Sequence, residues 1–333
     1  MRRSPLWRLL LLVTPGLAQV VEGLVTQLDL FPDNAAATDE GWAAWSPDGE
    51  TLLFGSNRGG NANLWLKTGD QAARQITDHP AFDGHGTWSP DGRRIAFLSE
   101  RSGSIGIWIL DLESGAVIPL VVDQPGLTLT ICAPSWSPQG RIAFEAVRNS
   151  DADAVTFTGA DKTLRHPNVD IFTVAENGSD LERLTDSPGS DGYPAYSPDG
   201  SLIAFDSNRT GEFGIWVMNA DGSEQHQITS GGDDGFSAWH PSGGWLAFQS
   251  NRAGNPDIWM VNLDGSGLRQ LTSDSANDIN ATFTHDGRFL TFISRRNGGD
   301  QDIFLLDLST VPTLQVIETV QPPKKGTRCL ERQ

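Results

Sequence analysis

One short pattern, an aromatic residue followed by a Ser-Pro-Asp-Gly-like turn and an apolar strand, occurs six times in this chain of 333 residues. Consecutive copies are separated by 43, 48, 60, 43 and 44 residues, close to the roughly 40–45 residues of a four-stranded propeller blade. The copies begin at Trp45, Trp88, Trp136, Tyr196, Trp239 and Phe283. No stretch shows sustained helical periodicity. We therefore expect one all-β domain over residues 24–320, a six-bladed β-propeller with four antiparallel strands per blade.

Residues 82–122 show how one repeat is built. The turn Ser89-Pro90-Asp91-Gly92 joins the first two strands, because Pro fixes φ early in a turn and Gly accepts the left-handed conformation that ends it. Residues 94–99 place Ile95 and Phe97 on one side, as a half-buried strand does. The recurrent Trp and Phe side chains are expected to pack between neighbouring blades, where each ring buries a large apolar area.

A closed ring removes exposed sheet edges, but one terminus must supply a strand that completes the last blade. Residues 24–31 and 313–319 both fit this role, and the sequence does not choose between them. The chain has only two cysteines, Cys132 in the third repeat and Cys329 near the C-terminus. An oxidising compartment would allow them to form one disulfide.

The first 18 residues have the pattern of a secretory signal peptide. Positive charges at Arg2, Arg3 and Arg8 precede a short apolar run and small residues suited to cleavage. The run is far shorter than the roughly 20 residues of a membrane-spanning helix. We expect a periplasmic or secreted protein without a membrane span; an N-terminal anchor or a misassigned start is the alternative. Residues 321–333 are expected to form a flexible tail.

The excess of acidic over basic residues limits the kinds of molecule that the protein can bind. Lys and Arg total 24 and Asp and Glu total 42, which gives a net charge of −18. Such a surface repels nucleic acid and anionic lipid. Basic protein patches, cations and neutral ligands are the compatible partners.

Five of the six repeats carry an acidic residue five positions before the anchoring aromatic residue. These residues are Glu40, Asp83, Asp191, Asp234 and Asp278, and the third repeat has Ile131 instead. If the first strands line the channel, the carboxylates form an incomplete ring near its mouth, on the face that carries the links between blades (the link face). Arginines of the Ser-X-Arg loops, such as Arg101 and Arg209, emerge on the same face. Either each acid pairs with a neighbouring arginine and orders the blade junction, or some acids bind a cation or a basic segment of a partner.

The third repeat also carries the longest irregular loop, residues 150–169, on the link face. Long loops on a rigid scaffold often carry specificity, although an inert insertion is equally tolerable. Catalytic motifs and metal-ligand spacing of histidines are missing. His85, two residues after Asp83, is the one histidine expected near the channel mouth. We expect no cofactor, and calcium in the channel is the one ion left open.

The motifs Trp-Ser-Pro-Asp-Gly, Ile-Ala-Phe-X-Ser-X-Arg, Ile-Trp and Leu-Thr recur in this order over nearly all of residues 24–320. The set resembles the WD-like repeats of the TolB family. The resemblance implies a periplasmic six-bladed propeller that works by binding proteins of the cell envelope. Full-length members have an additional α/β domain before the propeller, whereas here the propeller is expected almost directly after the signal peptide. Similar repeats occur in propellers attached to prolyl-oligopeptidase-like hydrolases and in pectin-degrading lyases.

Two functions remain open from the sequence. The leading hypothesis is a monomeric binding module whose link face docks a protein or peptide, in cell-envelope integrity or transport. The alternative is a propeller enzyme, a cation-dependent hydrolase, lactonase or lyase, with its site at the channel mouth. A structural paralogue without a ligand of its own is a third hypothesis.

Overall fold

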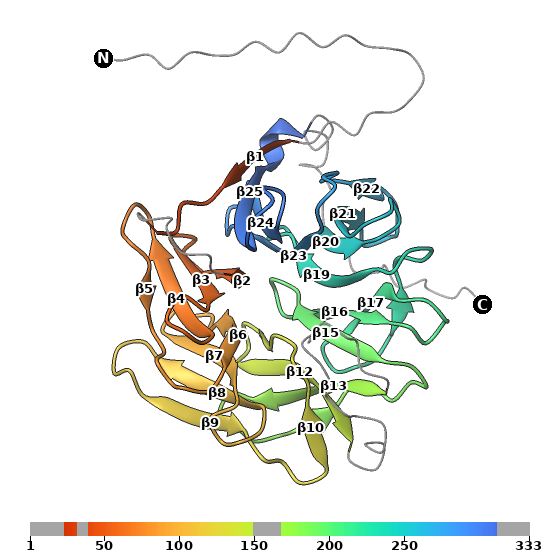
Figure 1. Ribbon diagram of the computed structural model, residues 1–333. Coiled ribbons are helices and arrows are strands. Elements are labelled where there is room, and N and C mark those ends of the chain that lie inside the picture. The colour runs from red at the N-terminus through yellow and green to blue at the C-terminus, as the bar shows by residue number, and fades with distance from the viewer. Residues whose placement is uncertain (1–22, 32–38, 149–167, 312–333) are drawn as a thin grey trace, which may run out of the picture.

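Six antiparallel sheets surround a central axis in the computed structural model, which describes residues 23–31, 39–148 and 168–311 (Figure 1). This arrangement confirms the six-bladed β-propeller. Blade 1 contains β2 (Glu40–Trp45), β3 (Thr51–Ser56), β4 (Asn63–Thr68) and β5 (Arg74–Gln75). Blade 2 contains β6 (Asp83–Trp88), β7 (Arg94–Ser99), β8 (Gly106–Asp111) and β9 (Val117–Val121). Blade 3 contains β10 (Leu127–Leu129), β11 (Ser135–Trp136), β12 (Arg141–Arg148), β13 (Val169–Ala175) and β14 (Glu182–Arg183).

The second half of the ring repeats the same order. Blade 4 contains β15 (Asp191–Tyr196), β16 (Leu202–Ser207), β17 (Gly214–Asn219) and β18 (His226–Gln227). Blade 5 contains β19 (Gly235–Trp239), β20 (Trp245–Ser250), β21 (Asp257–Asn262) and β22 (Arg269–Gln270). Blade 6 contains β23 (Asp278–Phe283), β24 (Phe289–Ser294), β25 (Asp302–Asp307) and β1 (Leu24–Gln27), and a 3₁₀ turn η2 (Leu308–Thr310) follows β25.

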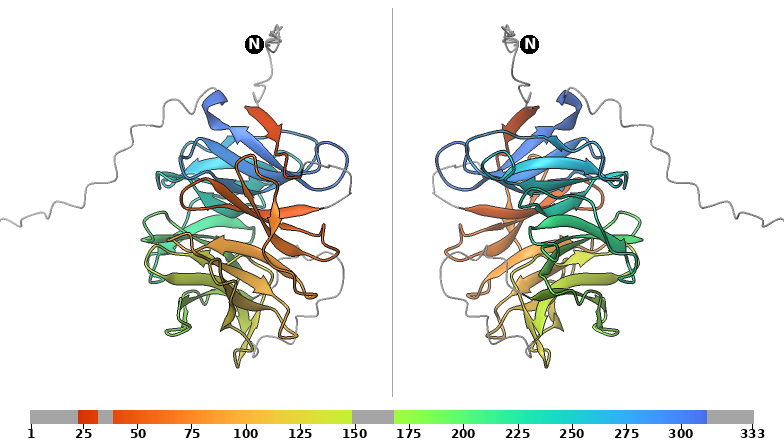
Figure 2. Two further views of the ribbon diagram at one scale, coloured as in Figure 1. Left: turned by 90° about the vertical axis from the view of Figure 1, so that its left-hand side faces the viewer. Right: turned by 90° about the vertical axis from the view of Figure 1, so that its right-hand side faces the viewer.

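The N-terminal candidate strand closes the ring. Strand β1 pairs antiparallel with β25, with Leu24 opposite Asp307 and Gln27 opposite Phe304, and Figure 2 shows the two strands side by side. The competing segment, residues 313–319, lies outside the described residues. So do the expected signal peptide, the C-terminal tail, Cys329 and all but the last two residues of the 150–169 loop.

Each blade is filled by the second strand, which is buried on both faces. One phenylalanine at the middle of each second strand is at most 2% exposed; they are Phe54, Phe97, Phe144, Phe205, Phe248 and Phe292. The anchoring aromatic residues join neighbouring blades. The indole N–H of Trp88 donates to the carbonyl oxygen of Ala44 at 3.0 Å, and that of Trp239 to Ala195 at 2.8 Å. Both acceptors belong to the inner strand of the preceding blade.

The Ser-Pro-Asp-Gly turns have the local structure that their residues predict. In blade 2, Gly92 has φ of 69°, in the left-handed region that Gly adopts without steric cost. The Ser89 hydroxyl donates to Asp91 at 2.5 Å and accepts the backbone N–H of Arg94 at 2.9 Å. The hydrogen bond from Ser89 is the largest cause of the lowered pKa of Asp91. These turns lie at the end of the ring opposite the link face, which we call the turn face.

No helix among the residues described here is long and apolar enough to cross a membrane.

Candidate functional site

The acidic residues at the start of the inner strands lie in buried clusters with arginines of their own blades. Asp83 accepts two hydrogen bonds from Arg101, both at 2.9 Å. The guanidinium of Arg101 also lies 5.2 Å from the ring centres of Phe97 and Trp108. The carboxylate of Asp83 is fully buried. Its removal would therefore leave the charge of Arg101 without a counterion.

The same cluster recurs in three further blades. Asp191 pairs with Arg209 at 2.8 Å, Asp234 with Arg252 at 2.5 Å, and Asp278 with Arg296 at 2.7 Å. In blade 1, Glu40 accepts a hydrogen bond from Ser56 at 3.2 Å. Pairing with an arginine, one of the two arrangements that the sequence leaves open, is therefore what the structure shows for the four aspartates. Whether these residues also bind a ligand stays a prediction.

Blade 3 departs from this pattern at its inner strand. The acid is replaced by Ile131 and the serine of the Ser-X-Arg motif by Ala146, while Arg148 keeps its place. The inner strand is divided into β10 and β11, which both pair with β12. Strand β12 carries Glu145 directly after its central phenylalanine, and its side chain is 6% exposed.

The other five inner strands each contain a β-bulge with a left-handed residue. The ladder shifts register between the second and fifth residues of these strands or, in β19, between the first and fourth. The residue three positions before the anchor has φ between 50° and 56° in each case; these residues are Trp42, His85, Tyr193, Phe236 and Asn280. Bulky residues rarely adopt this region. Such strained positions cluster at sites where a fixed side-chain direction matters.

Four of these residues form a chain of rings across the channel, which we call the aromatic cluster: Trp42, His85, Tyr193 and Phe236. The ring centres of Trp42 and His85 are 3.8 Å apart, as are those of Tyr193 and Phe236. Trp42 and Phe236 are 6.1 Å apart. These two residues belong to blades 1 and 5, which are not neighbours in the ring, so the contact crosses the space that the inner strands surround in Figure 1.

His85 is therefore part of a larger group. The sequence predicts His85 near the channel mouth, but it predicts no role for Trp42, Tyr193 and Phe236. The signal was an aromatic side chain at one fixed position, three residues before the anchor. This signal is interrupted in the sequence, because blade 3 has Ala133 and blade 6 has Asn280 at that position.

Two carboxylates lie beside the aromatic cluster at the junction of blades 3 and 4. The Oε2 atom of Glu145 accepts the backbone N–H of Tyr193 at 2.9 Å, and its Oε1 accepts the hydroxyl of Thr130 at 2.5 Å. Asp206, 1% exposed, stands opposite Gly192 in the ladder of blade 4. A Cβ atom on Gly192 would overlap Glu145 Oε2 and lie 3.8 Å from an oxygen of Asp206. Gly192 thus separates two buried acidic side chains, which we call the carboxylate pair.

The buried thiol of Cys132 lies in the field of this pair. Burial is the largest cause that raises its pKa well above the ordinary value, and Glu145 and Asp206 raise it further. A thiol with a raised pKa remains protonated and is a poor nucleophile. Cys132 is accordingly a packing residue rather than a reactive one.

The channel wall of blades 5 and 6 offers hydrogen-bond acceptors. Ser237 Oγ, Gln249 Oε1 and Asn280 Oδ1 are buried and have no hydrogen-bond partner among the described residues. Gln249 stands opposite Gly235 in the ladder, directly before Phe236, and Asn280 occupies the left-handed position of blade 6. Buried polar atoms are usually satisfied, so each of these three atoms would gain from a donor that the described residues do not supply.

Each of the six links between blades carries an exposed or partly exposed aspartate, which together we call the acidic rim: Asp39, Asp78, Asp123, Asp186, Asp233 and Asp274. No described residue of these links is a lysine or arginine. The arginines that pair with the buried aspartates have side chains only 10% to 15% exposed. Those four arginines therefore do not neutralise the acidic rim, although Asp39 of the rim pairs with Arg295 at 2.9 Å.

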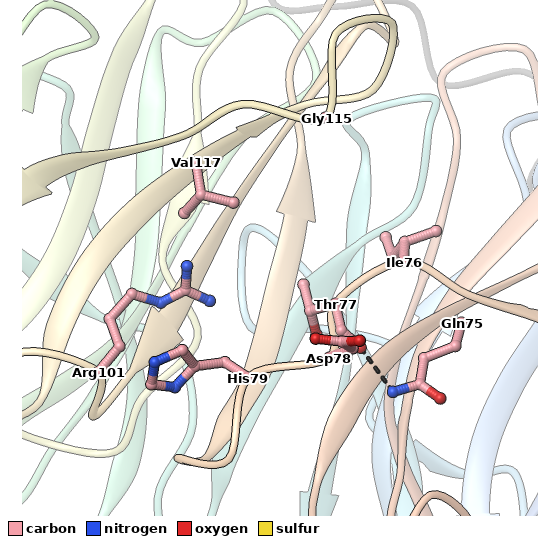
Figure 3. A pocket seen from close by; sticks show the side chains of 8 residues that line it. All are labelled: Gln75, Ile76, Thr77, Asp78, His79, Arg101, Gly115 and Val117. Carbon is pink, nitrogen blue, oxygen red and sulfur yellow. Dashed lines mark hydrogen bonds between the residues drawn. The ribbon is translucent and has the colours of Figure 1, made fainter.

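A pocket of about 550 Å³ lies between blades 1 and 2. Its lining includes Gln75, Asp78, His79, Arg101 and Val117. Figure 3 shows Arg101 and His79 on one side of this pocket and Asp78 on the other. The pocket is continuous with the acidic rim through Asp78. Among the residues that the structure describes, no group of three or more His, Cys, Asp and Glu side chains is arranged to hold a metal ion.

Residues 34–163 match the family described as the TolB beta propeller domain. A stretch of 94 residues, 28% of this chain, is 34% identical to Uncharacterized protein Atu1656 of Agrobacterium fabrum, and it spans 27% of that protein. Among solved structures, a putative TolB from Agrobacterium tumefaciens superposes with a TM-score of 0.59 and 24% identity, over 81% of this chain and 90% of that one.

Propellers with other functions superpose equally well. An oligogalacturonate lyase in complex with manganese gives a TM-score of 0.61 at 17% identity, over 86% of this chain and 98% of that one. A gluconolactonase from Xanthomonas campestris gives 0.62 at 19% identity, over 86% and 90%. At these identities the likeness concerns the fold alone.

Proposed function

Because this chain is a TolB-like six-bladed β-propeller, we propose that it is a binding module whose link face docks a basic segment of a protein or peptide. The proposal places it in the periplasm or outside the cell, in keeping with the signal-like residues 1–18. Its partners would be proteins of the cell envelope.

The acidic rim is the observation that carries this proposal. Each of the six links between blades carries one of these aspartates, and four arginines of the same face are occupied by buried partners. Such a surface attracts positively charged segments over several ångströms and repels anionic ones. The attraction weakens as salt increases, because exposed charges are screened.

A basic peptide tests this function directly. We suggest a decalysine peptide, titrated by calorimetry at low and at physiological ionic strength. The triple variant Asp78→Asn, Asp123→Asn, Asp186→Asn removes three rim charges without changing side-chain size. Exposed charges contribute roughly 0.2–1 kcal/mol each, so we expect the triple variant to bind at least about 3-fold more weakly.

The turn face offers a matched control. Asp221 and Asp264 are exposed and Asp111 is partly exposed. Each accepts a backbone N–H of a serine, which an asparagine can accept as well. Changing these three to Asn removes the same charge from the opposite face. Equal affinity of the two triple variants for decalysine would contradict docking on the link face, and a peptide that binds neither the variants nor the unmodified protein would exclude the function.

The carboxylate pair gives the enzyme hypothesis a specific site. Two buried acidic groups near a channel are one arrangement that general acid–base chemistry uses. This second candidate function is a hydrolase, lactonase or lyase at the channel mouth. Its dependence on a cation would appear as a rise in melting temperature when calcium is added, and Glu145→Gln would abolish that rise. A melting temperature that calcium leaves unchanged would remove the cation-dependent form of this candidate.

A further inference from the structure

We infer that the channel mouth binds one arginine side chain of the docked segment, with its guanidinium against the aromatic cluster. This inference rests on the proposed function and specifies which residue of a basic partner the propeller recognises. It follows from three features of the channel: aromatic faces, unsatisfied acceptors and negative charge.

The aromatic faces come from Trp42, Tyr193 and Phe236, which are all partly exposed. A guanidinium is planar and weakly hydrated, and it stacks on aromatic rings better than an ammonium does. The same chain already uses this contact elsewhere. The guanidinium of Arg58 lies 3.8 Å from the ring centre of Phe31, and that of Arg209 lies 4.7 Å from Trp216.

The acceptors lie on the neighbouring blades. Ser237 Oγ, Gln249 Oε1 and Asn280 Oδ1 lack hydrogen-bond partners among the described residues. Asn280 shares its left-handed position with the residues of the aromatic cluster, and Ser237 follows Phe236 directly. Arginine presents five N–H donors and no acceptor. It therefore complements a wall in which acceptors are left over.

The charge of the channel favours a cation. The carboxylate pair lies behind the backbone of Gly192 and Tyr193, in a buried environment where charges act more strongly than in water. The described inner strands contain no lysine or arginine. An arriving guanidinium would meet attraction from the rim to the channel and no positive side chain on the inner strands.

The left-handed backbone keeps the rings in place before a ligand arrives. Trp42, Tyr193 and Phe236 have φ of 50°, 50° and 56°. The ladder fixes each bulge on both sides. A site whose rings are already oriented loses less entropy when it binds.

Three short peptides test the inference on the unmodified protein. They are Lys-Lys-Arg-Lys-Lys, its all-lysine counterpart and a version with citrulline, the neutral isostere of arginine, at the centre, all with capped ends. We expect the arginine peptide to bind at least about 10-fold more tightly than the other two, as measured by calorimetry. Equal affinity of the three peptides would overturn the inference and leave docking on the acidic rim intact.

Variants of the aromatic cluster locate the preference. Trp42→Asn and Phe236→Asn place at these positions the residue that blade 6 already has at Asn280, and asparagine tolerates the left-handed region. We expect both variants to lose the preference for arginine, so that the arginine peptide and the all-lysine peptide bind with similar affinity. Trp259→Phe, in the third strand of the same blade as Phe236, is the control that should retain the preference. Retention of the full preference in both Asn variants would overturn the site, whereas failure of all three peptides to bind would overturn the proposed function as well.

Discussion

Glu145 of blade 3 accepts a hydrogen bond from the backbone N–H of Tyr193 in blade 4, at an O···N distance of 2.9 Å. This N–H belongs to a left-handed residue inside a bulge, where the ladder of blade 4 does not pair it. Glu145 is thus a positioning residue that acts through Tyr193. Blade 3 lacks the buried acid that its neighbours carry five residues before the anchor, and Glu145 instead orders the channel side of the next blade.

Substitution of Glu145 should separate this positioning role from simple packing. Glu145→Leu removes the acceptor of a buried N–H, which costs about 1–3 kcal/mol of stability. Glu145→Gln keeps one amide oxygen for Tyr193 and should lose less. Urea unfolding of both variants measures the difference. The role would be refuted if Leu proved as stable as Gln.

The close approach of Glu145 to Gly192 gives a second prediction. A Cβ atom at Gly192 would overlap Glu145 Oε2, whereas one at Gly41, the equivalent position of blade 1, would have Ile293 Cδ1 at 3.9 Å as its nearest neighbour. We expect Gly192→Ala to lower the unfolding free energy by about 1–3 kcal/mol. Gly41→Ala should be neutral or stabilising by about 0.4–1 kcal/mol, because alanine restricts the unfolded chain.

Thermal melts of the Gly192→Ala and Gly41→Ala variants compare the two positions under one condition. Equal melting temperatures would show that Glu145 moves aside without cost. In that case the contact between the carboxylate and the blade 4 backbone would not be a fixed feature of the junction.

The repeat made the fold predictable. Residues such as Pro90 and Gly92 act locally through their fixed or permissive φ, so six copies of one turn at blade spacing indicate six blades. Ring closure was not predictable in the same way, because two terminal segments had suitable strand patterns. Pairing of Leu24 with Asp307 depends on contacts between the two ends of the chain, which no local pattern encodes.

The candidate site was predictable only in part. The acids before each anchor were visible at a fixed spacing, but their pairing with arginines 18 residues later, as between Asp83 and Arg101, depends on which side of the strand each faces. The aromatic cluster was not predictable because a bulge redirects one residue per inner strand. A regular alternation of two does not anticipate the direction of Trp42 or Phe236.

Replacing an aspartate of a buried ion pair should cost much more stability than replacing one of an exposed ion pair. Asp83→Asn leaves the charge of Arg101 buried without a counterion, which typically costs about 3–5 kcal/mol. Asp39→Asn removes the partner of Arg295 from an exposed bridge at 2.9 Å, where the cost is about 0–1 kcal/mol. Chemical denaturation of the two variants measures both values. A similar, small loss in both would mean that Asp83 does not need its charge.

The aspartates of the Ser-Pro-Asp-Gly turns should make the free energy of unfolding decrease at acidic pH. The pKa of Asp91 is lowered from its ordinary value of 3.8, first by the hydrogen bond from Ser89 and then by the backbone N–H of Arg93; Asp199 behaves in the same way through Ser197 and Ser201. A lowered pKa in the folded state stabilises the fold fully above the unfolded pKa, and this contribution is lost as the pH falls through the folded value. Asp278 opposes this trend, because burial raises its pKa.

A single turn isolates the effect from these opposing groups. Ser89→Ala removes the first cause of the lowered pKa, so the loss of stability between pH 5 and pH 3 should be smaller in the variant than in the unmodified protein. Ser102→Ala is the control, because the Ser102 hydroxyl donates to a backbone carbonyl, that of Ser104, and its removal should leave the pH dependence unchanged. Urea unfolding at the two pH values gives the comparison. If Ser89→Ala showed the same pH dependence as the unmodified protein, the serine hydroxyl could not be what holds the carboxylate of Asp91 ionised.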